Sequence, residues 1–195
     1  MIAGLGWCGM KRLLMVPAAL TLLAALIPPA IASAASDSKT SLLPVNEADQ
    51  LQTHSWVDCS APPLCRFTVG VRLQTPEGLT GFPPDLWARQ STEIRSSKRT
   101  AYLDVHTDGG EGWFKDRGGP GTKVFKDGTG AVIQSMYYGE GPPEKYQTNG
   151  SIDVLEYSTG QPKTDANVIV CTHVQVVYAG VNLTTPSTCA QTVFS

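Results

Sequence analysis

The chain has 195 residues, with 15 Lys and Arg against 17 Asp and Glu, so its formal net charge is −2. Only 16% of its residues are charged, and 42% are hydrophobic, which is enough for a folded core. This composition excludes a disordered acidic tail, a basic nucleic-acid-binding arm, a coiled coil and a collagen-like rod. We therefore expect a globular chain with no nucleic-acid partner, in which 19 Gly and 14 Pro form many turns.

Residues 1–34 have the three parts of a secretory signal peptide. Lys11 and Arg12 precede an apolar run from Leu13 to Ile27, and small residues at 30–34 offer an Ala-x-Ala cleavage site. The run is shorter than the ~20 apolar residues that a membrane-spanning helix needs. We predict cleavage and a secreted or periplasmic chain with no transmembrane segment once mature; an uncleaved anchor is the alternative.

Two further expectations concern the ends of this signal. Met10 directly precedes the basic pair, so translation begins at Met1 or at Met10. After the cleavage site, residues 35–53 are polar, which predicts a flexible leader or an edge segment. Residues 54–195 then form a single β domain.

Alternation of apolar and polar residues with period two predicts β-strands along this domain. The predicted strands are 66–73, 101–107, 131–138, 152–157, 167–178 and 191–194. Segment 167–178 carries apolar groups on both faces, which is typical of a central strand. Pro83-Pro84-Asp85 offers the start of one short helix that continues through Leu86, Trp87 and Gln90. The pattern predicts an all-β, antiparallel β-sandwich of about seven to nine strands, Ig-like or jelly-roll-like, with one short helix.

Four cysteines follow the signal peptide: Cys59, Cys65, Cys171 and Cys189. An even count in an exported chain predicts two disulfides. Three connectivities are possible, and closeness in the sequence favours Cys59–Cys65 and Cys171–Cys189. A zinc site is the alternative, although no Cys-x-x-Cys pair is present.

The stretch from Asp104 to Glu111 is the first candidate for chemistry. On a strand, Asp104, His106 and Asp108 point to one side, and Glu111 beyond the turn adds a further oxygen. An imidazole between two carboxylates could bind calcium or zinc, or act as a general base. The alternative is the polar face of a half-buried strand, because no second His lies near and no His-Glu-x-x-His motif occurs.

Aromatic residues form the second candidate. Trp113 and Phe114 lie in the Gly-rich segment 108–130, and Tyr137, Tyr138 and Tyr146 flank a Gly-Pro-Pro turn. Adjacent aromatics on a strand point to opposite faces, so one of each pair is expected to be exposed. Such a side chain could stack on a sugar or anchor a protein partner. The alternative is that these rings fill the core.

A third feature is the concentration of basic residues that follows the predicted helix, namely Arg89, Arg95, Lys98 and Arg99. It predicts a solvated loop, or else a contact with an anionic partner.

No nucleophile elbow or other catalytic signature occurs. The leading prediction is a secreted or periplasmic, non-catalytic binding module without a cofactor, whose aromatic residues contact an unknown protein or glycan. One alternative is a metal-dependent hydrolase or calcium-stabilised module that uses residues 104–111, with calcium or zinc bound. The other is an enzyme inhibitor or immunity protein that acts through the Gly-rich segment.

Overall fold

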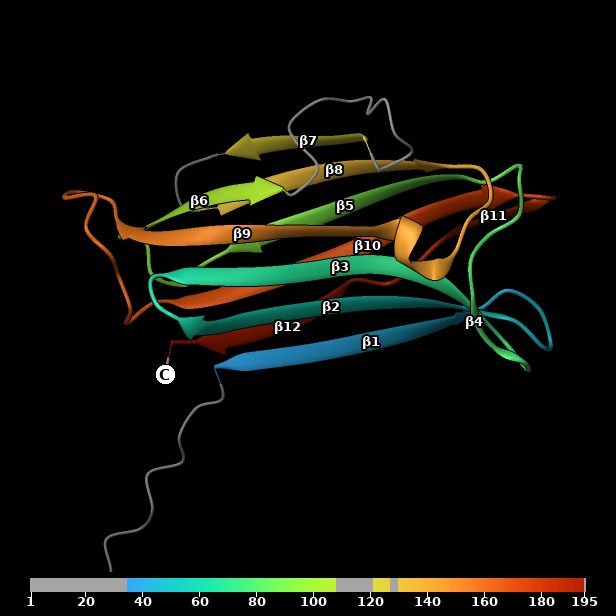
Figure 1. The fold of residues 1–195 in the computed structure, drawn as a ribbon, viewed down its shortest axis with the longest axis horizontal. Helices are drawn as coiled ribbons and strands as arrows, with labels where there is room; N and C mark the ends of the chain where they lie inside the picture. Colours follow the sequence, from blue (N-terminus) through green and yellow to red (C-terminus); the bar gives the residue numbers. More distant parts are fainter. Residues whose placement is uncertain (1–34, 108–120, 127–129, 195) are drawn as a thin grey trace, which may run out of the picture. The chain divides into compact units, whose positions relative to one another are not determined.

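The computed structural model describes residues 35–107, 121–126 and 130–194, which form two antiparallel β-sheets packed face to face (Figure 1). The expected antiparallel sandwich is confirmed. The helical structure of the described residues is one 3-10 turn, η1 (Pro143–Tyr146). None of their helices is long and apolar enough to span a membrane.

The first sheet lies in front in Figure 1 and has the order β1-β2-β3-β9-β6, with β4 paired to β3. Its strands are β1 (Ser36–Pro44), β2 (Gln50–Ala61), β3 (Leu64–Thr75), β4 (Gly78–Thr80), β6 (Ala101–Thr107) and β9 (Gln147–Glu156).

The second sheet has the order β11-β10-β5-β8-β7, and β12 also pairs with β10. Its strands are β5 (Trp87–Arg95), β7 (Gly121–Lys126), β8 (Gly130–Tyr138), β10 (Asn167–Tyr178), β11 (Val181–Thr184) and β12 (Thr188–Val193). Strand β10 is central, as its two apolar faces predicted, because it pairs with β5 on one side and with β11 and β12 on the other.

The inward faces of the two sheets form two separate apolar clusters. The first cluster gathers around Phe67, Ile94 and Val170, and the second gathers around Leu51, Tyr137 and Val174. All six side chains are at most 2% exposed. Strands β2, β5, β8 and β10 each contribute to both clusters, one near each end of the strand.

Between the clusters, the inward positions of these four strands are polar, and we call them the polar belt. It consists of Thr53, Ser55, Gln90, Thr92, Ser135 and Thr172, all of which are buried. The Ser55 hydroxyl donates to the Val170 carbonyl in the opposite sheet at 2.8 Å. The Ser135 hydroxyl lies 2.6 Å from that of Thr148, also across the two sheets. The belt therefore links the sheets by hydrogen bonds in the middle of the core.

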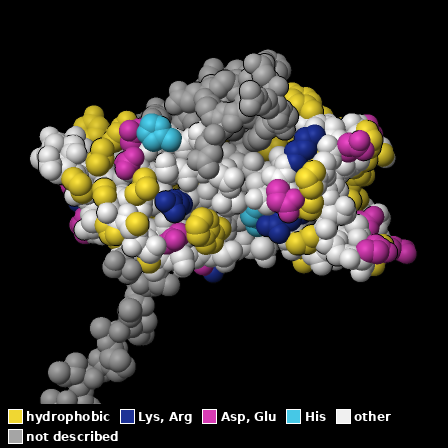
Figure 2. All heavy atoms as spheres, viewed as in Figure 1, with side chains coloured by type: hydrophobic (Ala, Val, Ile, Leu, Met, Phe, Trp, Pro, Cys, Tyr) yellow, Lys and Arg dark blue, Asp and Glu magenta, His cyan; other side chains and the backbone are white. Residues whose placement is uncertain are grey.

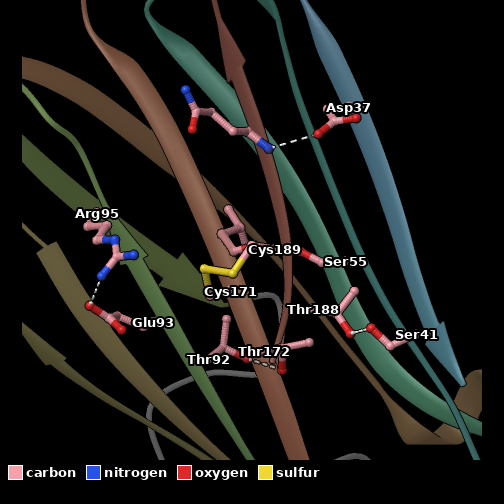
Figure 3. The surroundings of a disulfide bond; sticks show 12 residues. Asp37, Ser41, Ser55, Thr92, Glu93, Arg95, Cys171, Thr172, Thr188 and Cys189 are labelled. Atoms are coloured by element: carbon pink, nitrogen blue, oxygen red, sulfur yellow. Dashed lines mark hydrogen bonds and ion pairs between the residues drawn. A yellow bond between two sulfur atoms is a disulfide. The ribbon is translucent and has the colours of Figure 1, made fainter. Parts of the chain in front are cut away.

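Polar contacts also close one edge of the sandwich, where β1 meets β12 (Figure 3). The Asp37 carboxylate accepts a hydrogen bond from the backbone N–H of Gln191 at 3.0 Å, and the Ser41 and Thr188 hydroxyls lie 2.6 Å apart. The Gln191 N–H, helped by the Lys39 ammonium, lowers the pKa of Asp37 below its usual value. Residues 36–44 form an edge strand, which is the second of the two expectations for residues 35–53. The first, a flexible leader, does not hold, because β1 and the start of β2 occupy that range.

The predicted helix at 83–90 is also wrong. A turn in which the Leu86 N–H donates to the Pro83 carbonyl leads directly into β5 at Trp87. From Trp87 to Arg95 exposed or half-buried residues alternate with buried ones, which is the period of a strand. Pro83 and Pro84 resemble the start of a helix in the sequence, whereas in the structure they belong to the irregular connection that precedes β5. The described residues also contain more strands, β1 to β12, than the seven to nine expected.

Both predicted disulfides are confirmed. Cys59–Cys65 closes the β2–β3 hairpin, with the two Cα atoms 4.1 Å apart. Cys171 and Cys189 are direct cross-strand neighbours on β10 and β12, with the two Cα atoms 4.0 Å apart. Each bond ties a strand of one sheet to its neighbour in the same sheet.

The polar belt generates a first prediction, at the Thr92–Thr172 pair, whose hydroxyl oxygens lie 3.0 Å apart. Thr172→Val keeps the side-chain shape but leaves the Thr92 hydroxyl buried without this partner, so the free energy of unfolding should fall by about 1–3 kcal/mol. The double variant Thr92→Val/Thr172→Val removes both hydroxyls and should be less destabilised than Thr172→Val alone.

Urea unfolding measures both effects, with Thr40→Val on the exposed face of β1 as the control. A double variant that loses as much stability as the sum of the two single variants would contradict the pairing.

Candidate binding surface

The outer face of the second sheet carries a row of apolar side chains at one end. Val177, Trp87 and Tyr138 are register partners on β10, β5 and β8, so they lie side by side on one face. Tyr138 is 51% exposed, and the other two side chains are half-buried. We call these three residues the aromatic row, after its two aromatic members, Trp87 and Tyr138.

A polar hollow of about 270 Å³ lies beside the aromatic row on the same face. It is lined by Arg89, Ser91, Gln134, His173, Gln175 and Thr184. Arg89 follows Trp87 by two residues on β5, so the two side chains are neighbours along the strand.

Hydrogen bonds fix the orientation of the side chains in the hollow. The Arg89 Nε donates to the Gln134 Oε1 at 3.0 Å, and the Gln134 Nε2 donates to the Ser91 Oγ at 2.9 Å. Within the described part of the chain, neither terminal nitrogen of Arg89 has a hydrogen-bond acceptor. The guanidinium is therefore held at one edge, and its two terminal amino groups are available to a ligand.

Two of the tyrosines predicted to form a contact surface are core residues instead. Tyr137 is 2% exposed and Tyr146 is fully buried, and their rings meet edge to face in the second cluster. Burial raises the pKa of Tyr137, whose hydroxyl lies 2.8 Å from that of Thr148. The Tyr146 hydroxyl donates to the Gly139 carbonyl. With their rings packed and their hydroxyls paired, these side chains present no surface to a partner.

The other predicted aromatic contacts have different outcomes. Tyr138 is exposed, as alternation along its strand indicated. Trp113 and Phe114 lie outside the described residues.

The predicted metal site is only partly within the described residues. Asp104 and His106 share one face of β6, and the His106 Nε2 lies 3.3 Å from the Asp104 Oδ2. Asp108 and Glu111 lie outside the described residues. Among side chains that the structure describes, no three potential ligands gather as a metal site would require.

His54 is buried on the outer face of the first sheet, beside Gly70 of β3. A Cβ atom at Gly70 would lie 2.8 Å from the His54 Cε1, so the glycine makes room for the ring. Both ring nitrogens are buried without a hydrogen-bond partner among the described residues. Desolvation, with a smaller contribution from the Arg72 charge, lowers the pKa of His54 to about 4. The side chain is therefore a neutral packing element near pH 7.

The basic cluster of the sequence is not one solvated loop. Arg89 and Arg95 project from the exposed face of β5, whereas Lys98 follows the strand. Arg95 pairs with Glu93 at 3.0 Å, and Lys98 lies 3.6 Å from Asp165. Of these residues, only Arg89 lines the hollow.

Sequence reasoning missed Trp87 and Arg89 as parts of one surface. The signal was present, since Trp87, Arg89 and Ser91 alternate with the buried residues Ala88 and Gln90. Because a helix was expected over residues 83–90, the side chains were assigned the 3.6-residue period of a helix instead of the two-residue period of a strand. Figure 2 shows the opposite face of the sandwich, on which basic, acidic and apolar side chains are interspersed among other polar ones.

Comparisons with known proteins add little to this geometry. No family model matches the chain, and no curated protein matches it. Among solved structures, the chain is similar to the GAE domain of GGA2p from Saccharomyces cerevisiae, with 8% sequence identity and a TM-score of 0.34. That match covers 79% of this chain and 96% of the other.

The buried His54 generates a second prediction. Its pKa in the folded state, about 4, lies below the ordinary histidine value of 6.5. Between these two pH values the unfolded state binds the proton and the folded state does not, so stability falls as pH falls through this window. From pH 7 to pH 4.5 this group alone should lower the free energy of unfolding by about 2–3 kcal/mol.

The variant His54→Phe keeps an aromatic ring and removes the titration, so its stability should depend less on pH between 7 and 4.5. Urea unfolding at both pH values measures this, with His106→Phe as the control because the His106 side chain is 52% exposed. An equally steep loss in His54→Phe would show that other groups cause it.

Proposed function

We propose that this chain is an exported, non-catalytic binding module whose contact surface is the outer face of the second sheet. The observation that carries the proposal is the position of the exposed Tyr138 and its register partner Trp87 beside the polar hollow. Aromatic rings next to oriented polar groups are typical of binding sites, because the rings supply contact area and the polar groups supply orientation.

The scaffold beneath this surface favours recognition without rearrangement. The site residues belong mainly to β10, β5 and β8, which are paired on both sides. Their inward faces contribute Thr172, Thr92 and Ser135 to the polar belt. A surface that is already ordered loses little conformational entropy when a ligand binds.

The chemistry of the hollow supports binding rather than catalysis. A nucleophilic hydroxyl needs a neighbouring base to remove its proton. The Ser91 Oγ accepts a hydrogen bond from Gln134, whose amide has no basic nitrogen. His173 is the register partner of Ser91 and also lines the hollow, but no hydrogen bond joins the two side chains in the described structure. The hollow therefore offers donors and acceptors to a ligand, with no activated nucleophile among its described lining residues.

Export is part of the proposal. It is supported by the signal-peptide pattern of residues 1–34 and by the two disulfides, which persist in oxidising compartments. A contact through Trp113 and Phe114, and an inhibitory role for segment 108–130, stay proposals from the sequence.

The exposed ring of Tyr138 gives the test of this function. The exported protein is screened against immobilised glycans and displayed peptides, and affinities are measured by calorimetry. Tyr138→Ala should weaken binding of the selected ligand at least about tenfold, the size of effect that truncating an important interface aromatic produces. Folding should be unchanged, because the ring is half exposed.

Tyr157→Ala is the matched control, because Tyr157 is 69% exposed and lies beside Tyr102 of the first sheet. Equal affinities of Tyr138→Ala and the parent protein would contradict the proposed surface. Recovery of a cleaved ligand, detected by mass spectrometry, would contradict a non-catalytic role.

A further inference from the structure

The polar hollow has one charged side chain among its lining residues, the guanidinium of Arg89. We propose that the ligand of this surface is a glycan that bears a carboxylate, with a sugar ring on the aromatic row and the carboxylate on Arg89. This inference rests on the proposed function and names the class of ligand.

The fixed orientation of Arg89 favours a carboxylate. Gln134 occupies the Nε edge of the guanidinium at 3.0 Å, so Nη1 and Nη2 remain as a parallel pair of donors. Two parallel N–H groups match the two oxygens of a carboxylate, and such paired hydrogen bonds are stronger and more specific than a single one. A single hydroxyl group offers this pair one neutral acceptor atom, whereas a carboxylate offers two charged ones.

The charged side chains near Arg89 also favour an anionic ligand. The described charged side chains on this face of β5 are Arg89, Glu93 and Arg95, and Glu93 is held by Arg95 at 3.0 Å. Neither member of that pair lines the hollow. An anion at Arg89 therefore meets a positive charge that no described acidic lining residue neutralises.

The spacing between Arg89 and the aromatic row fits one substituted sugar ring. Side chains two residues apart on a strand are about 7 Å apart, and Trp87 and Arg89 have this relation. Tyr138 is the cross-strand partner of Trp87 and extends the apolar platform onto β8. A ring lying on this platform can direct a carboxylate at its edge toward Arg89.

A glycan fits this face better than a peptide does. Strands β10, β5 and β8 are paired on both sides, so their backbone groups cannot bind an added peptide strand. The rest of the hollow consists of hydroxyl, amide and imidazole side chains, namely Ser91, Thr184, Gln134, Gln175 and His173. These groups suit the many hydroxyls of a sugar.

The test uses matched pairs of acidic and neutral ligands with the exported protein. The pairs are oligogalacturonate with its methyl ester, and sialyllactose with lactose; mannuronate and guluronate oligomers and an acidic hexapeptide complete the panel. Affinity is measured by calorimetry at low and high salt. At least one acidic glycan should bind about tenfold or more tightly than its neutral partner, with a salt-dependent affinity.

The variant Arg89→Gln should reduce that affinity at least about tenfold, and it should abolish the preference over the neutral partner. The control is Arg95→Gln, on the same strand and face but outside the hollow, which should bind like the parent protein. Near-UV circular dichroism checks that both variants keep the native packing.

Each other outcome overturns the inference. It is overturned if no acidic glycan of the panel binds, or if an acidic glycan and its neutral partner bind with equal affinity. It is also overturned if the acidic peptide is the only ligand whose binding depends on Arg89. If a neutral glycan or a peptide binds and Tyr138→Ala removes that binding, the inference fails and the proposed function stands. If Tyr138→Ala has no effect on any ligand found, both fail.

Discussion

Hydrogen bonds made by buried hydroxyls in the middle of the sandwich join its two sheets and favour the way they face each other. Ser55 of β2 reaches the carbonyl of Val170 in β10, and Ser135 of β8 meets Thr148 of β9. An unpaired buried hydroxyl costs about 1–3 kcal/mol, so a shift of the sheets that broke these two contacts would be penalised. The pairing in the belt is incomplete, since the Thr53 hydroxyl and the Gln90 amide have no hydrogen-bond partner among the described residues. Apolar contacts alone tolerate small shifts more readily, because they have no preferred direction.

The proposed binding surface depends on the same alignment. Side chains alternate between the two faces of a strand, so Thr92 and Ser135 point inward only when Ser91 and Gln134 point outward. A slip of one residue in β5 or β8 would expose the belt and bury Arg89. The register of the core strands therefore determines which side chains lie on the outer face.

The candidate site was only partly predictable. Tyr137 and Tyr138 were both predicted as contact residues, but Tyr138 is exposed whereas Tyr137 is a core residue. Local sequence does not say which member of such a pair faces inward. The aromatic Tyr146 is buried because η1 brings it back against Phe82 and Tyr137. The placement of Trp87 and Arg89 on one strand face was missed because Pro83-Pro84-Asp85 resembles a helix start, and tertiary pairing with β10 and β8 overrides that local signal.

The sequence by itself determined the class of fold, the strands with clear alternation and the two disulfides, because these follow from local backbone geometry and from cysteines close in the chain. Only the tertiary structure decided which strands are neighbours. It placed β5 between β10 and β8, which are far from it in sequence, and so brought Trp87 to Tyr138 and Arg89 to Gln134. The physical reason is that strand order depends on how two whole faces bury their apolar groups and pair their buried hydroxyls, which no local pattern encodes.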